Sequence, residues 1–190
     1  LDQLIRLAPD ASWARLLWCR TALALTHRDR ETFERAVEYL TSMPVVAEFP
    51  AETPVLLARY QIELHEFEQA QRSLSEFSEP ESTAADAGPI EGARLYQLAL
   101  LGQKKYAECL NYIERLPESA LGCQADEIAA CCHNALNHPE QAVARFDNVD
   151  VLHLSKSARR AYLSALLELK QFDRLDDVLN SWKRAGLKGV

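Results

Sequence analysis

The chain has 190 residues, 48% of them hydrophobic, with only 6 glycines and 8 prolines, which excludes a disordered tract and allows a sizeable core. Its net charge of −7 and the absence of any run of more than two Lys or Arg residues disfavour binding to nucleic-acid phosphates or anionic lipid. No stretch approaches the roughly 18 continuous apolar residues of a membrane span.

The chain opens with LDQLIRLAPDA, which looks like the close of a helix pair with Pro9 in the terminal position. We therefore expect further repeats upstream of Leu1. The residues that follow are predicted to form five pairs of helices. The first helix of each pair is an apolar-faced segment, expected at residues 13–26, 54–64, about 91–101, 125–136 and 157–169.

Each second helix opens on a related four-letter segment. These segments are FERA at Phe33, FEQA at Phe67, YAEC at Tyr106, PEQA at Pro139 and FDRL at Phe172. By subtraction, successive starts are 34, 39, 33 and 33 residues apart. A spacing this regular predicts that one structural unit is used repeatedly.

The second helices share one apolar face, because offsets of three, seven and ten residues from each start lie on the same side of a helix. All fifteen residues at these offsets are apolar: Ala36, Ala70, Cys109, Ala142 and Leu175, then Leu40, Leu74, Ile113, Phe146 and Leu179, then Met43, Phe77, Leu116, Val149 and Trp182. Chance would give this roughly once in 10^4 to 10^5 trials at this composition. We expect this face to be buried.

Polar turns such as HE, GQKK, NH and KQ join the two helices of a pair, and prolines at 44, 80 and 117 follow the second helix. Residues 26–32 lengthen the first turn, and the segment from Ser78 to Pro89 lengthens the junction between the second and third pairs. Both segments are expected to be surface loops, with contact to a partner as the alternative.

Helix pairs with a period of about 34 residues, an aromatic residue opening the second helix and Ala three residues later resemble the tetratricopeptide (TPR) repeat. The resemblance implies an all-α, right-handed solenoid of antiparallel helix pairs. A single array would span 1–190, with 1–11 closing a preceding repeat and repeats at about 12–49, 50–83, 89–122, 123–155 and 156–188. Pro139 and the large residues at offset ten depart from the family pattern.

The resemblance also implies that the first helices line a concave groove, so that exposed positions on them would contact a partner. The candidate groove residues are Arg20, Arg59, Glu63, Glu127, Arg160, Ser164 and Glu168. The arginines could pair with carboxylates of a bound peptide or helix. The alternative is that these side chains form an ordinary solvated face.

Some TPR domains grip a C-terminal carboxylate with Lys and Asn at set groove positions. Here the corresponding positions hold Val55, Glu127 and Arg160, then Arg59, Cys131 and Ser164. The carboxylate-gripping pattern is therefore absent, and we do not expect binding of chaperone tails by that route.

The sequence lacks the motifs of phosphate loops, CxxC sites, HExxH metalloproteases and Ser-His-Asp hydrolases, so no enzyme, cofactor or metal site is expected. In CCHNALNH, Cys132 and His133 point about 100° apart on a helix, which disfavours a tetrahedral zinc site. Trp13, Trp18 and Trp182 have aliphatic neighbours and are expected in the core.

The leading hypothesis is a protein–protein interaction scaffold without catalysis of its own, binding a peptide or helix of a protein partner. Alternatives are the TPR region of a bacterial secretion or envelope-assembly protein, an RNA-binding helical repeat, and a regulatory arm of an enzyme. Five cysteines without an even framework favour reduced thiols and a cytoplasmic location, with the periplasm as the alternative.

Overall fold

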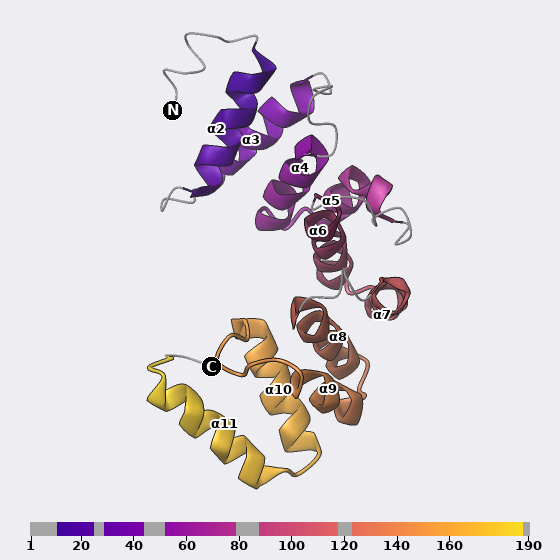
Figure 1. Cartoon of the computed structure of the whole chain (residues 1–190), viewed down its shortest axis with the longest axis vertical. Helices are drawn as coiled ribbons and strands as arrows, with labels where there is room; N and C mark the ends of the chain where they lie inside the picture. Colours follow the sequence, from indigo (N-terminus) through magenta and orange to yellow (C-terminus); the bar gives the residue numbers. More distant parts are fainter. Residues whose placement is uncertain (1–10, 25–28, 44–51, 79–87, 118–122, 188–190) are drawn as a thin grey trace. The chain divides into compact units, whose positions relative to one another are not determined.

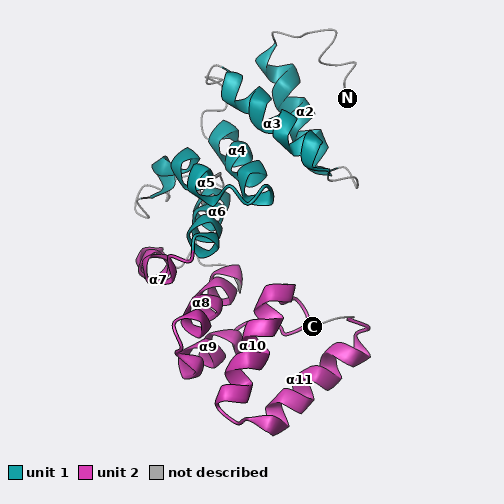
Figure 2. Ribbon diagram, turned by 180° about the vertical axis from the view of Figure 1, so that it is seen from behind, with its two compact units in different colours: residues 1–103 teal, residues 104–190 magenta. Residues whose placement is uncertain are grey.

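The computed structural model describes residues 11–24, 29–43, 52–78, 88–117 and 123–187. Over these residues the chain is all-helical, with ten α-helices, one short 3-10 helix and no strand. The chain divides into two compact units, Leu1–Gln103 and Lys104–Val190 (Figure 2). The prediction of an all-α chain is confirmed, and each unit is described by itself below.

Unit 1 contains two complete helix pairs and one further first helix (Figure 1). Its helices are α2 (Ser12–Ala24), α3 (Arg30–Ser42), α4 (Glu52–Glu63), α5 (Phe67–Ser73) followed by the 3-10 helix η1 (Ser75–Phe77), and α6 (Gly88–Gly102). The predicted close of a preceding repeat in residues 1–11 lies almost wholly outside the described residues, as do Pro44, Pro80, residues 26–28 of the first long loop and residues 79–87 of the second. Residues 30–32, which were predicted to lie in the first long loop, instead form the start of α3.

Unit 2 begins with the second helix of a pair, and two complete helix pairs follow it. Its helices are α7 (Tyr106–Arg115), α8 (Cys123–Ala135), α9 (Pro139–Phe146), α10 (Lys156–Glu168) and α11 (Phe172–Arg184). Helices α5, α7, α9 and α11 begin at the residue that the four-letter segments predicted. Helix α3 begins three residues before Phe33, because the Asp29 carboxylate caps it by accepting a hydrogen bond from Thr32 N at 2.7 Å.

The turns inside the last four pairs share one backbone conformation. His65, Lys104, Asn137 and Lys170 have φ values of 63°, 61°, 63° and 56°, and each lies two residues before a second helix. In three of these turns the next amide bonds back to the end of the first helix: Glu66 N to Gln61 O, His138 N to His133 O and Gln171 N to Leu166 O. This left-handed cap ends the first helix and redirects the chain into the second.

The predicted apolar face of the second helices is buried at thirteen of its fifteen positions. The two exceptions lie on α11, where Leu175 is half-buried and Leu179 is 37% exposed. There the buried side chains are Val178 and Trp182, which face α10. Leu175 packs against the edge of the buried cluster to which they belong, whereas Leu179 lies about 100° round the helix from Val178.

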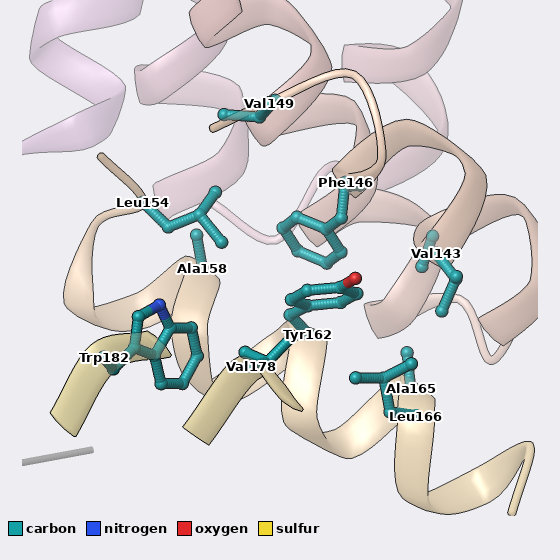
Figure 3. Close-up of a cluster of buried hydrophobic side chains, with 12 residues drawn as sticks. Val143, Phe146, Val149, Leu154, Ala158, Tyr162, Ala165, Leu166, Val178 and Trp182 are labelled. Carbon is teal, nitrogen blue, oxygen red and sulfur yellow. The ribbon is translucent and has the colours of Figure 1, made fainter. Parts of the chain in front are cut away.

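The core of unit 2 joins α9, α10 and α11 through aromatic contacts (Figure 3). The ring centroids of Phe146 and Tyr162 are 4.8 Å apart, and Trp182 donates from Nε1 to the carbonyl oxygen of Val151 at 2.7 Å. In unit 1, a cluster of buried residues joins α2, α3 and α4, and the buried Tyr60 hydroxyl donates to the carbonyl oxygen of Cys19 at 2.6 Å. Packing between successive pairs therefore holds each unit together.

Candidate protein-binding surface

The outward side of α2 is a single stripe. The exposed residues of this helix are Trp13, Leu17, Arg20 and Ala24, and their spacing of four, three and four residues places them on one face. The buried residues of this helix, Ala14, Leu16, Trp18, Cys19 and Ala22, lie outside this stripe. The predicted groove residue Arg20 is therefore exposed on the side away from the core.

Arg20 already has a carboxylate partner within the chain. Its Nε and Nη2 atoms donate to the two carboxylate oxygens of Glu52 in a bidentate pair. Glu52 is the first residue of α4, so the pair joins the first helices of two successive repeats. It leaves 46% of the Arg20 side chain and 25% of the Glu52 side chain exposed, so the pair remains accessible to a competing carboxylate.

Arg59 repeats this arrangement one helix pair later in the chain. Its Nη1 lies 3.9 Å from a carboxylate oxygen of Glu91 on α6, and Arg94 donates to the same carboxylate at 2.9 and 3.0 Å. Both Arg20–Glu52 and Arg59–Glu91 span 32 positions of sequence, by subtraction of the residue numbers. The equal spacing indicates that α2 meets α4 as α4 meets α6. Glu63, one turn beyond Arg59, is also exposed.

Unit 2 carries the other four predicted residues. The Glu127 carboxylate on α8 accepts from Ser155 N at 3.4 Å, and Ser155 caps the start of α10. Arg160, Ser164 and Glu168 follow on α10 at intervals of four residues, so they share one face. Arg160 and Glu168 are exposed, and Ser164 is half-buried.

The structure thus gathers Arg20, Arg59 and Glu63 on unit 1, and the remaining candidates on unit 2. All of them except the half-buried Glu127 and Ser164 are exposed, which agrees with a position on the outward side of the first helices. A single groove running through both sets stays a prediction.

The prediction that Trp13 is buried is wrong. The sequence placed all three tryptophans in the core, and Trp18 and Trp182 are indeed 3% and 2% exposed, but Trp13 is 59% exposed. Five residues of helix turn the chain by about 140°, so Trp13 and Trp18 cannot share a face. The stripe of Trp13, Leu17 and Arg20 was the missed signal for a second, exposed face on α2.

Burial keeps the thiols of Cys19 and Cys131 protonated near neutral pH. Cys19, Cys109, Cys131 and Cys132 are free, and burial raises the pKa of both Cys19 and Cys131 to about 12. The pKa of Cys132 is also raised, chiefly by a hydrogen bond with Cys109. Burial lowers the pKa of His133, so this imidazole is neutral near pH 7. No metal-binding group of three or more His, Cys, Asp or Glu residues occurs in the part of the chain that the structure describes.

Comparisons with known proteins give no match. No protein-family model, no curated protein and no solved structure matches the chain. Among the described helices, none has both the length and the apolar character needed to cross a membrane.

Proposed function

We propose that the chain is a protein–protein interaction scaffold: a TPR-like, right-handed array of helix pairs whose first helices bind a peptide or helix of a protein partner. The observation that carries the proposal is the outward stripe of Arg20, Arg59 and Glu63 on two successive first helices. Repeated helix pairs build extended binding surfaces from such stripes. The raised pKa values of Cys19 and Cys131 make these two thiols poor nucleophiles, which is consistent with a binding role.

The ion pairs on this surface favour a binding mode in which a carboxylate of the partner competes with a carboxylate of the chain for the same arginine. Arg20 and Arg59 already face Glu52 and Glu91, so a partner carboxylate gains one ion pair while another is loosened. Exposed ion pairs contribute only about 0–1 kcal/mol each. Charge on this surface should therefore select the partner and its orientation, while apolar contacts supply most of the affinity.

Affinity capture with the 190-residue chain tests the proposal. A variant with Arg59→Glu and Arg160→Glu changes one first helix in each unit and should lose the captured protein. The matched control, Arg72→Glu with Arg184→Glu, makes the same change of charge at exposed positions on the second helices α5 and α11. The control should keep the partner. Equal capture by both variants would show that the first helices are not the binding surface.

Two further measurements separate the alternatives. Tight retention of RNA at low salt in a filter-binding assay would favour a nucleic-acid role over a protein partner. Thiol labelling of native protein without reductant distinguishes the compartments, because disulfides in the purified protein would favour the periplasmic version over the cytoplasmic one.

A further inference from the structure

Two cysteines from neighbouring helices meet in the core of unit 2. Cys109 lies on α7 and Cys132 lies on α8, and these two helices pack against each other. Both side chains are 0% exposed, and their thiols share a hydrogen bond. The two sulfur atoms are therefore in direct contact, although the cysteines lie 23 positions apart in the sequence, by subtraction.

The repeat pattern explains why the two helices can approach closely at this point. Cys109 occupies the offset-three position of its second helix, where Ala36, Ala70 and Ala142 stand in three other pairs. In unit 1 the backbone at this position is within reach of a first helix, because the Cys19 thiol on α2 donates to the carbonyl oxygen of Ala36 at 3.8 Å. A disulfide bond requires a close approach of this kind, since it joins Cα atoms no more than about 7 Å apart.

Two other thiols of the described residues have different neighbours. Cys19 belongs to unit 1 and contacts Ala36. Cys131 directly precedes Cys132, but consecutive residues of a helix point about 100° apart. Its side chain packs against the buried cluster that contains Phe146. The geometry therefore favours pairing of Cys132 with Cys109.

We propose that Cys109 and Cys132 form a disulfide bond when the chain folds in the presence of a small-molecule disulfide such as oxidised glutathione. The bond fastens α7 to α8 and closes the stretch of chain between them into a loop. The proposal does not depend on the binding of a partner, because both side chains lie in the core.

The reaction is a thiol–disulfide exchange in two steps. The thiolate of one cysteine attacks a sulfur of oxidised glutathione, which forms a mixed disulfide and releases one glutathione thiolate. The thiolate of the other cysteine then attacks the protein sulfur of the mixed disulfide, which forms the bond between Cys109 and Cys132 and releases the second glutathione thiolate. The two protein sulfurs lose two electrons in total to glutathione, and the two thiol protons pass through the solvent to the released glutathione thiolates.

Burial determines when this exchange can happen. In the folded chain neither thiol is exposed. The hydrogen bond with Cys109 and burial raise the pKa of Cys132, so its reactive thiolate is scarce in the folded chain. The bond therefore forms before α7 and α8 enclose the two sulfur atoms. Once it has formed, the same burial shields it from reductants.

Refolding followed by peptide mapping tests the pairing. The 190-residue chain is unfolded in urea with a reductant, refolded with oxidised and reduced glutathione, and blocked with N-ethylmaleimide. Trypsin and a protease that cuts before Asp together place Cys109, Cys123 and the Cys131–Cys132 pair on three different peptides. Without reduction, mass spectrometry should find the first and third peptides linked, lighter than their sum by two hydrogen atoms. Fragmentation of the linked peptides identifies the bonded residue.

Single variants separate Cys132 from its neighbour. Cys131→Ala should keep the link, whereas Cys132→Ala and Cys109→Ala should each lose it. Cys109→Ala is expected to fold, because alanine stands at the same position in three other pairs. The unchanged chain should melt roughly 5–10 °C higher after oxidative refolding than after reductive refolding, as followed by circular dichroism. Cys109→Ala should melt at the same temperature after both treatments.

Three results would count against the proposal. Five free thiols in the chain after oxidative refolding would overturn it, and so would a link that survives in Cys132→Ala. The folded, reduced chain should form the link roughly 10-fold or more slowly than the refolding chain in the same glutathione mixture. Equal rates would contradict formation of the bond before burial.

Discussion

Gly92 is a position where the usual effect of a glycine-to-alanine change should reverse. Inside a helix, alanine is favoured over glycine by about 1 kcal/mol. A Cβ built on Gly92, however, would lie 2.5 Å from Cε1, 2.6 Å from Cδ1 and 2.7 Å from Cζ of Phe77. Carbon atoms in normal contact are about 3.5–4.0 Å apart. The ring would have to move by about 1 Å, and Phe77 is only 6% exposed.

The two effects set the expected size of the change. Overpacking a buried site costs about 1–3 kcal/mol, which outweighs the gain of about 1 kcal/mol from helix propensity. We therefore expect Gly92→Ala to lower the free energy of unfolding by roughly 1 kcal/mol. Urea unfolding followed by circular dichroism measures this as a lower midpoint with an unchanged slope.

The same change in a Phe77→Leu variant tests whether the Phe77 ring causes the loss of stability. Phe77→Leu keeps an apolar side chain but removes the ring that the new Cβ would meet. In this background Gly92→Ala should raise the free energy of unfolding, because helix propensity then acts without the clash. An alanine that stabilises both backgrounds equally would refute the close approach of α6 to Phe77.

Three further predictions follow from contacts in unit 1. A double-mutant cycle on Arg20 and Glu52 should give a coupling of about 0.2–1 kcal/mol that falls with added salt, as measured by urea unfolding. Tyr60→Phe should cost about 1 kcal/mol in the same assay, because its hydroxyl donates to the carbonyl of Cys19 at 2.6 Å in the core. The pKa of Cys19 is raised from 9.0 to about 12, so its contribution to stability is complete below pH 9 and is lost as the pH rises toward 12. The loss approaches about 1.4 kcal/mol per pH unit, and Cys19→Ala should show a shallower decline of unfolding free energy between pH 9 and pH 10.5.

The helix starts could be predicted from sequence because they rest on local information. An aromatic or proline residue followed three positions later by a small or apolar residue placed the beginnings of α5, α7, α9 and α11. Helix α3 did not follow this rule, because the Asp29 cap places its start three residues before Phe33. The left-handed residues of the turns were not predicted, because none of His65, Lys104, Asn137 and Lys170 is a glycine.

The candidate surface was harder to predict because its ion pairs connect positions far apart in the sequence. The sequence identified Arg20 and Arg59 as outward-facing, but Glu52 and Glu91 entered no prediction. Each pair spans 32 positions, close to the repeat period, so a search for opposite charges separated by about one period could have found both. Nothing local in either segment indicates the pairing.

Leu179 shows what a repeating apolar pattern encodes. It occupies the same position as Leu40, which is 2% exposed, yet it is 37% exposed itself. The pattern specifies which side of a helix needs a neighbour, but it does not specify where that neighbour comes from. Inside each unit the next helix pair supplies the cover, whereas at α2 and α11 no described pair does so. The two exposed side chains that were predicted to be buried, Trp13 and Leu179, lie on the first and the last of the described helices. The pattern therefore predicts burial reliably only for a helix that has a described neighbour on each side.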